Sequence, residues 1–404
     1  MKRLLVVIAG FSLLVGGLVQ SAPASKNAPS SKRLLVGIYD EAETLGHPDR
    51  AFPVLDQLRV KIVRANLYWG GPAGVAERRP SRATDPDDRA YNWFKYDRMV
   101  RMAAAENIRV VFAIVGTPRW ANGGKPFNRA PLKAADLRKF AQAAATRYSG
   151  SFTPGLPVTA TGNQEVEQDP LPAVRHWLAW NEPNNPVFLS PQFIRTKKGV
   201  FLRQAAKNYA RICNAIVAGI HAPAALRSEK IACGVTAPRG NNNPRASRQS
   251  ISPIPFVRQM KRFGARGFDA YAHHPYYGHP RETPSYQPRL NKGPRIVGGP
   301  ILLGNINDLA REVTRLWGRK PIWITEYGYQ TKPDRHLAVS YAQQAKYLTQ
   351  AFAIARKNPR IDMMLWFLVR DQGQTRAFDG WQGGLITKGG ARKPSFRAFQ
   401  RVPK

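Results

Sequence analysis

The strongest constraint on the fold of this chain is a series of eight short apolar runs. Amphipathic stretches with helical spacing separate them. The runs are rich in Val, Ile, Leu and aromatic residues. Several are near-continuous rather than alternating, which is typical of strands covered on both faces. Strands that alternate with helices predict a parallel sheet. The predicted strands are Leu34–Tyr39, Lys61–Leu67, Ile108–Val115, Arg175–Trp180, Ile231–Ala237, Phe268–His273, Pro321–Thr325 and Met363–Leu368.

Helical patterns lie between these runs and indicate how the sheet is built. Eight strand-then-helix units without a Gly-rich phosphate fingerprint favour a closed (β/α)8 TIM barrel over a doubly wound sheet. The sequence shows no internal repeat and no linker to a second domain, and its 43% hydrophobic content fits a globular protein. We therefore predict an α/β protein with a single domain over residues 33–404. Examples of the predicted helices are Asp97–Glu106, Ala134–Tyr148, Leu202–Ile220, Ile306–Leu316 and Val339–Arg356, followed by a short one near Phe396–Arg401.

The first 32 residues read as an export signal and a linker. Lys2 and Arg3 form a basic start, the stretch from Leu4 to Val19 is apolar, and small residues follow at Ala22-Pro23-Ala24. We predict a secretory signal peptide over residues 1–24 and a flexible linker over 25–32, with an uncleaved or lipid-linked form as the alternative. No later stretch is apolar enough to span a membrane, so we expect a secreted or cell-envelope protein.

Two cysteines exclude a disulfide framework and a cysteine-rich zinc module. Cys213 lies in a predicted helix and Cys233 in the following strand. Export to an oxidising compartment would allow a bridge between them, and two buried free thiols are the alternative.

Two glutamates stand at the ends of predicted strands. Glu182 follows the fourth strand in Trp180-Asn181-Glu182-Pro183, and Glu326 follows the seventh in Thr325-Glu326-Tyr327-Gly328. Side chains alternate along a strand, so Glu326 should point into the barrel and Trp323 outward. Two carboxylates facing each other across the mouth of a barrel are what glycoside hydrolysis needs, one as acid and one as nucleophile. The alternative is a pair of structural carboxylates, with Glu326 held by a core arginine.

These motifs resemble those of clan A glycoside hydrolases, of the family 5 and family 39 type. The resemblance extends over the whole mature chain and includes the tail from Gly383-Gly384-Leu385 to Lys393-Pro394-Ser395. It implies a retaining mechanism with Glu182 as general acid/base and Glu326 as nucleophile. It also implies that Asn181 binds the sugar 2-hydroxyl.

The resemblance further implies a set of substrate-binding residues. Arg64 matches the arginine that keeps the nucleophile ionised, and Tyr276 matches the tyrosine whose hydroxyl contacts it. His274 belongs with Tyr276, and Trp366 matches the platform beneath the sugar.

Two tryptophans after strands are further candidates, because indole rings stack well on sugar C–H faces. They are Trp69 and Trp120, with loop packing as the alternative. Weaker candidates are Tyr271, Tyr277, Trp323 and Trp381. No His/Cys/Asp cluster has metal spacing, and neither a Gly-x-Ser-x-Gly elbow nor a P-loop occurs, so we expect no cofactor.

The formal net charge is +36, and the excess is uneven. The stretch Pro183–Phe268 holds fifteen Lys or Arg residues and only one acidic residue, Glu229. We call this stretch the basic flank and expect it to bind an anionic envelope polymer. A solvated basic face is the alternative, and an acidic substrate is another reading. No nucleic-acid recognition motif is present, so we expect no such partner.

The sequence thus predicts a secreted retaining glycosidase acting on a β-linked oligo- or polysaccharide. The alternatives are a non-catalytic carbohydrate- or envelope-binding protein on the same fold, and a transglycosylase.

Overall fold

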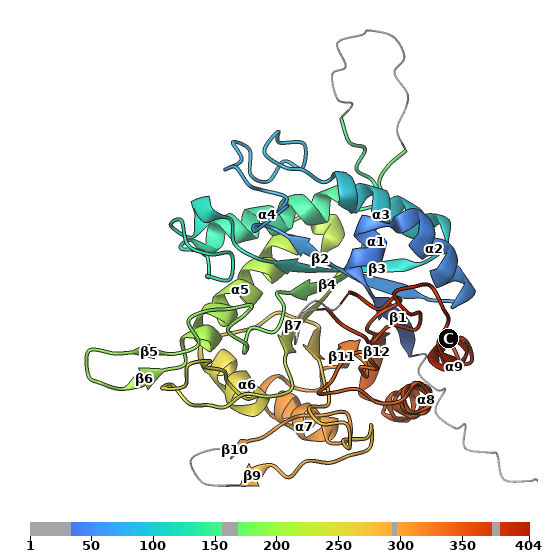
Figure 1. Cartoon of the computed structure of the whole chain (residues 1–404). Helices are drawn as coiled ribbons and strands as arrows, with labels where there is room; N and C mark the ends of the chain where they lie inside the picture. Colours follow the sequence, from blue (N-terminus) through green and yellow to red (C-terminus); the bar gives the residue numbers. More distant parts are fainter. Residues whose placement is uncertain (1–33, 156–168, 293–296, 374–379) are drawn as a thin grey trace, which may run out of the picture. The chain divides into compact units, whose positions relative to one another are not determined.

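The computed structural model describes residues 34–155, 169–292, 297–373 and 380–404. Eight parallel strands close into a barrel in the order β1-β12-β11-β8-β7-β4-β3-β2, and they occupy the centre of Figure 1. The predicted (β/α)8 barrel is therefore confirmed. The strands are β1 (Leu35–Tyr39), β2 (Ile62–Tyr68), β3 (Arg109–Val115), β4 (His176–Ala179), β7 (Lys230–Thr236), β8 (Ala270–His273), β11 (Ile322–Tyr327) and β12 (Ile361–Trp366).

Helices surround the barrel and cover the outer face of its strands (Figure 1). Burial on both faces explains the near-continuous apolar runs, since six of the seven residues of β2 are buried. The helices are α1 (Glu41–Gly46), α2 (Pro48–Gln57), α3 (Phe94–Ala105), α4 (Ala134–Arg147), α5 (Gln204–Ile220), α6 (Pro253–Arg262), α7 (Ile306–Trp317), α8 (Tyr341–Lys357) and α9 (Pro394–Gln400).

The barrel is closed by contacts between the two ends of the described chain. β1 pairs with β12, and Asp40, directly after β1, accepts hydrogen bonds from the backbone N–H groups of Val369 and Arg370, each at 3.1 Å. Burial raises the pKa of the Asp40 carboxyl to about 7. Asp40 also accepts from the Glu43 N–H and so caps α1.

The two cysteines form a disulfide that joins α5 to β7. The Cys213 and Cys233 Cα atoms lie 6.0 Å apart, and the bridge closes a sequence separation of 20 residues. The question that the sequence left open is thus answered in favour of a bridge.

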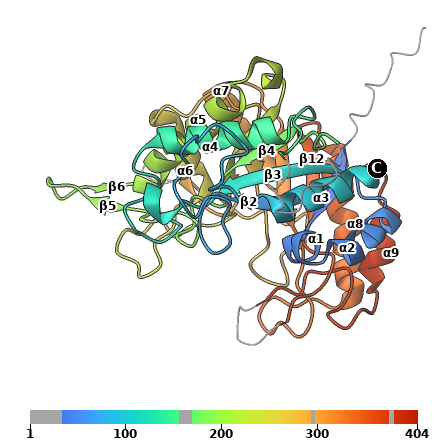
Figure 2. The ribbon, with the colours of Figure 1, turned by 90° about the horizontal axis from the view of Figure 1, so that it is seen from above.

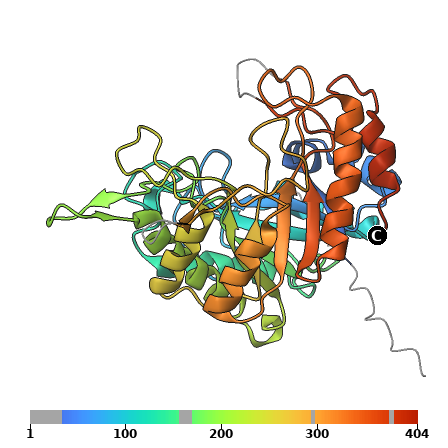
Figure 3. The same ribbon diagram turned by 90° about the horizontal axis from the view of Figure 1, so that it is seen from below.

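Long connections gather at the carboxyl ends of the strands, where a TIM barrel carries its active site. The loop after β7 includes Arg239–Ser252, and the loop after β8 contains the short strands β9 (Asn291–Lys292) and β10 (Val297–Gly298). A second hairpin, β5 (Ile194–Arg195) with β6 (Phe201–Leu202), follows β4 and extends away from the barrel (Figures 2 and 3).

Several predicted segments fall outside the described residues. These are the signal peptide over residues 1–24 and the linker over residues 25–32. Within the described residues, no helix has the length and apolar character needed to cross a membrane.

Candidate active site

A cavity of about 470 Å³ opens at the carboxyl ends of the strands, and both predicted glutamates line it. We call it the catalytic cleft. Glu182 follows β4, Glu326 lies near the end of β11, and their side chains are 13% and 10% exposed. One carboxylate oxygen of each lies within 4.8 Å of the other and of a ring nitrogen of His274. The predicted pairing of these two glutamates across the barrel mouth is therefore present.

Arg64, fully buried on β2, connects the polar groups beneath the cleft. Its Nη1 lies 2.7 Å from Glu326 Oε1, and its Nη2 donates to Asn181 Oδ1, also at 2.7 Å. Two parallel interactions through a planar guanidinium fix the position of both partners. Asn181 therefore has its oxygen occupied by Arg64, which leaves its amide N–H₂ to donate into the cleft that it lines.

Glu326 receives a second hydrogen bond from the opposite side. The Tyr276 hydroxyl donates to Glu326 Oε2 at 3.2 Å. Burial and the adjacent carboxylates keep the pKa of Tyr276 well above its usual value, so its proton stays on the hydroxyl. The two oxygens of Glu326 thus accept from different donors, and these two contacts fix the orientation of the carboxylate.

His274 links the two glutamates and is itself fully buried. Its Nδ1 lies 3.1 Å from Glu182 Oε1, and its Nε2 lies 3.2 Å from Arg64 Nη1. Burial lowers the pKa of His274 to about 3, so the ring is neutral at physiological pH. A guanidinium can only donate hydrogen bonds, so His274 Nε2 accepts from Arg64. The ring proton therefore lies on Nδ1, which donates a hydrogen bond to Glu182 Oε1.

Glu182 has the electrostatic properties of a proton donor near neutral pH. Burial raises its pKa to about 7, opposed by a hydrogen bond from Asn185 Nδ2 to Glu182 Oε2 at 3.0 Å. The backbone turns sharply here, since Trp180 and Glu182 have φ values of 72° and 35°. The Glu182 N–H donates to Val235 O at 2.8 Å, which ties this turn to β7.

The strand-parity argument for β11 was wrong, although Glu326 does reach the cleft. The Trp323 ring lies 5.6 Å from the His176 ring on β4, a strand that does not neighbour β11, so both rings point into the barrel. Thr325 points inward too, because its hydroxyl lies 3.0 Å from His274 Nε2. The register of β11 on β12 is irregular between Ile324 and Tyr327, and this irregularity re-aims Glu326.

Three predicted sugar platforms do not line the catalytic cleft. Trp366 is fully buried and donates to Gly383 O. Trp69 is also fully buried, stacked on Phe140 with ring centroids 5.8 Å apart, and Trp120 packs edge-on against Trp69. In the structure these three indoles pack in the core and against the loops.

Other aromatic side chains line the cleft instead, among them Phe367, Tyr277 and Trp381. Trp381 is 46% exposed, and its ring lies 5.9 Å from that of Phe367. Tyr277 and Trp381 were weaker candidates in the sequence, and Phe367 was missed. A sugar entering the cleft would thus meet aromatic surface from the loop after β12.

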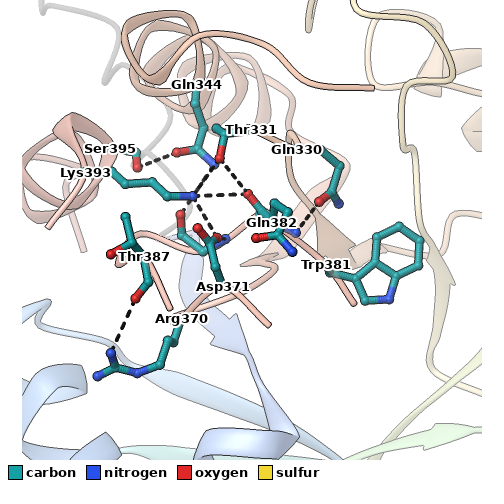
Figure 4. A network of polar contacts seen from close by, with 12 residues as sticks. Gln330, Thr331, Gln344, Arg370, Asp371, Trp381, Gln382, Thr387, Lys393 and Ser395 are labelled. Carbon is teal, nitrogen blue, oxygen red and sulfur yellow. Dashed lines mark hydrogen bonds and ion pairs between the residues drawn. The ribbon is translucent and has the colours of Figure 1, made fainter. Parts of the chain in front are cut away.

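The loop that carries Trp381 is held by a buried ion pair (Figure 4). Lys393 Nζ lies 2.7 Å from Asp371 Oδ1 and also donates to Thr331 Oγ1 and Gln382 O. Next to Gln382, the Trp381 N–H donates to Gln372 Oε1 at 3.1 Å. These contacts fix the base of the loop on both sides of the exposed indole.

A third carboxylate, Glu41, lines the same cleft and was missed in the sequence. It accepts from the Tyr68 hydroxyl at 2.9 Å and the Tyr39 hydroxyl at 3.2 Å. The signal was present, because the acidic pair Asp40-Glu41 directly follows the first strand. This carboxylate can accept hydrogen bonds from sugar hydroxyls.

A second cleft of about 550 Å³ also reaches Glu182 but not Glu326. We call it the side cleft. It shares Glu182, Asn185 and Arg248 with the catalytic cleft, and Arg239 lines it as well. Arg239 is held by Glu282 at 2.6 Å and donates to Tyr276 O at 2.9 Å.

Glu182, His274 and Glu326 offer atoms close enough together to hold a metal ion. The Arg64 guanidinium already lies 2.7 Å from Glu326 and would repel a cation at that point. Proton transfer and nucleophilic attack therefore suit this cluster better than metal binding.

Comparison with known proteins agrees with this geometry. Residues 302–391, which include Glu326, match the family model described as the glycosyl hydrolase catalytic core. This part of the chain is therefore similar to the catalytic core of glycosyl hydrolases. The predicted resemblance to clan A glycoside hydrolases and the prediction of a glycosidase-type enzyme are confirmed at this level. The comparison with curated proteins gave no match.

Several solved glycoside hydrolases share the fold of this chain. A family 39 glycoside hydrolase from the gut symbiont Bacteroides cellulosilyticus WH2 is 18% identical, with a TM-score of 0.56 over 92% of this chain and 64% of its own. A glucosidase from Croceicoccus marinus is 15% identical, with a TM-score of 0.60 over 92% and 67%. A GH5_18 protein from Bifidobacterium longum subsp. infantis is 14% identical, with a TM-score of 0.53 over 92% and 78%. The chain spans just under two thirds of the first of these.

Proposed function

We propose that this protein is a retaining glycosidase that cleaves β-linked O-glycosidic bonds of an oligo- or polysaccharide by double displacement. The observation that carries the proposal is the approach of one Glu182 oxygen to within 4.8 Å of a Glu326 oxygen. Retaining glycosidases place their two carboxyl groups about 5–5.5 Å apart, whereas inverting ones leave about 6.5–9.5 Å for a water molecule.

Glu326 is the nucleophile in this proposal. Its carboxylate lies against Arg64 at 2.7 Å, which holds it in position to attack the anomeric carbon. Tyr276 donates to the other oxygen of Glu326, so both carboxylate oxygens are oriented before the sugar binds. Attack forms a glycosyl–enzyme bond as the bond to the leaving oxygen breaks.

Glu182 is the general acid and then the general base. A pKa of about 7 leaves a substantial protonated fraction at neutral pH, so the carboxyl can protonate the leaving oxygen. The resulting carboxylate then takes a proton from the water that releases the sugar from Glu326. Asn181 donates its free amide to the 2-hydroxyl of the same sugar.

The two clefts divide the substrate around the bond that is cleaved. The catalytic cleft contains both glutamates and would hold the sugar that is attacked, with Trp381 and Glu41 contacting it. The side cleft contains only the acid and would hold the leaving group. Arg239 and Arg248 line that side, and they would donate hydrogen bonds to its oxygens.

A panel of chromogenic β-glycosides and dyed polysaccharides tests the proposal, with the anomer of the first-formed product read by NMR. Glu326→Ala should lose at least about 10³-fold in kcat. Glu41→Gln is the matched control, because it removes a carboxylate from the same cleft and should act mainly on KM. Unchanged activity in Glu326→Ala, or release of the inverted anomer, would overturn the mechanism. An added acceptor sugar separates hydrolysis from transglycosylation.

We also propose that the protein is exported and degrades polysaccharide outside the cell or at the cell envelope. The support is the basic and apolar start of the sequence, which predicts removal of residues 1–24. N-terminal sequencing of the secreted protein tests this, since a mature chain that retains Leu4 would contradict cleavage.

The net charge of +36 supports a further part of the proposal, attraction to an anionic polymer. Fewer basic side chains of the basic flank are free to bind an anion than the sequence predicted. Lys230, Arg239 and Arg258 form ion pairs with Asp269, Glu282 and Glu312. Arg195, Lys197 and Lys198, on the exposed β5–β6 hairpin, form no ion pair within the described residues.

A further inference from the structure

A groove of about 930 Å³ lies between α8 and α9 on the side of the barrel, where the two helices run side by side in Figures 1 and 3. We call it the α8–α9 groove. Its floor contains the buried side chains of Phe352, Phe396 and Val402. None of the residues that line it lines the catalytic cleft or the side cleft.

Five basic side chains other than the buried Lys393 line this groove, and no acidic residue does. They are Lys346, Arg356, Arg392, Arg397 and Arg401. The surrounding sequence is equally one-sided, since residues 335–361 and 380–404 contain no Asp or Glu at all. The local charge is therefore positive along the whole length of both helices.

The charges of the groove are not neutralised by the protein itself. None of the ion pairs formed within the described residues involves any of the five basic side chains. Arg356 and Arg392 donate to uncharged oxygens, of Pro403 and Gln57, and Lys346, Arg397 and Arg401 are exposed. Clustered like charges repel one another, and a bound anion would relieve that repulsion.

We propose that the α8–α9 groove binds an anionic polysaccharide that carries carboxylate groups on successive sugars. Four of the five cations are arginines, whose planar guanidinium matches a carboxylate with two parallel hydrogen bonds. A concave groove lined by basic side chains suits a single polymer chain, with the carboxylates of its sugars toward the basic side chains at the rims.

The side chains of the groove favour a polysaccharide over a single-stranded nucleic acid. Proteins that bind single strands without sequence preference present exposed aromatic rings on which bases stack. The two aromatic rings of the groove, Phe352 and Phe396, are 2% and 0% exposed, and Arg392 covers the Phe396 ring at 4.4 Å. The groove thus offers positive charge but no stacking platform.

The site goes beyond the proposed catalysis and does not depend on it. The groove would keep the enzyme on a polymer while the catalytic cleft acts on sugars elsewhere along it. It also assigns the attraction to anionic polymers to α8 and α9 rather than to the basic flank.

Binding of fluorescently labelled polygalacturonate to the purified full-length protein tests the proposal. The triple variant Lys346→Gln, Arg397→Gln, Arg401→Gln changes only exposed side chains, so it should fold. We expect its Kd to rise at least tenfold, with a smaller slope of log Kd against log salt concentration. The matched control is Arg195→Gln, Lys197→Gln, Lys198→Gln, which removes the same charge from the basic flank and should change Kd less than twofold.

Three results would overturn the proposal. An equal or larger loss in the flank variant would show a diffuse attraction or a different site. An unchanged Kd in the groove variant would exclude the groove, and tighter binding of poly(U) than of polygalacturonate would assign it to nucleic acid. Cleavage of a small chromogenic glycoside should be the same in both variants. That readout separates a failure of this site from a failure of the proposed catalysis.

Discussion

Arg64 and Glu326, separated by 262 residues in the chain, lie in contact at 2.7 Å beneath the catalytic cleft. Arg64 is fully buried on β2, and Glu326 lies near the end of β11, where the strand register is irregular. This ion pair makes the nucleophilic role of Glu326 dependent on the exact position of one arginine.

Arg64→Lys should therefore lower kcat about 10²-fold or more while KM changes little. A lysine keeps the charge, but it cannot contact Asn181 and Glu326 at once through a planar fork. Circular dichroism shows whether the variant is folded. A rise in KM with kcat unchanged would assign Arg64 to substrate binding instead.

The pH profile should show a basic limb that belongs to Glu182. Its pKa, raised by burial to about 7, means that the acid form is lost as pH rises through that value. Asn185→Ala removes a hydrogen bond that lowers this pKa, so the limb should move to higher pH. The kcat/KM of a β-glycoside with a poor leaving group, measured from pH 4 to 9, checks both statements.

Glu182→Gln should stabilise the folded protein at neutral pH. The folded-state pKa of Glu182 is raised from 4.5 to about 7, so the folded state loses stability, relative to a neutral side chain, as pH rises through that window. The gain in unfolding free energy should be near zero at pH 4 and about 1–3 kcal/mol above pH 7. Equal Tm differences at both pH values would contradict a raised pKa.

Trp381→Ala should raise KM for oligosaccharides several-fold, because stacking of a sugar on indole is lost. Trp381→Phe should restore part of the affinity. Trp69→Ala serves as the comparison, since Trp69 is fully buried against Phe140. Its removal should lower the free energy of unfolding by about 3–5 kcal/mol, seen as a lower Tm, without a selective change in KM. The reverse pattern would return Trp69 to the sugar site.

Reduction of the Cys213–Cys233 bridge should lower the stability of the folded protein by about 3 kcal/mol, as expected for a closed loop of this size. The double variant Cys213→Ala, Cys233→Ala should show the same loss. Thermal unfolding with and without a reductant is the measurement. A reductant that lowers the Tm of the double variant as well would point to some other effect.

The fold was largely predictable from the sequence, because burial on both faces of the barrel strands leaves near-continuous apolar runs in several of them. The positions of Glu182, Glu326 and Arg64 were predictable for a related reason. Motifs at strand ends converge once the sheet closes into a barrel.

Side-chain direction was less predictable where strands depart from regular geometry. Parity placed Trp323 outside the barrel, but the irregular register of β11 lets both Thr325 and Glu326 face inward. At β12 the neighbouring residue Phe367, rather than Trp366, reaches the cleft. Loop residues such as Trp381 depend on contacts like the Lys393–Asp371 pair, which no local pattern reveals.

The hydrogen bonds from the backbone N–H groups of Val369 and Arg370 to Asp40 have a consequence for how activity arises. Glu41 comes from the start of the described chain and Trp381 from near its end, so the sugar site needs both. A polypeptide that ends before β12 would contain Glu182, Glu326 and Arg64. It would lack the strand that closes the barrel and keeps the two glutamates close together. Sugar cleavage should therefore emerge only after β12 and the loop that carries Trp381 have been synthesised, in a single step rather than by degrees.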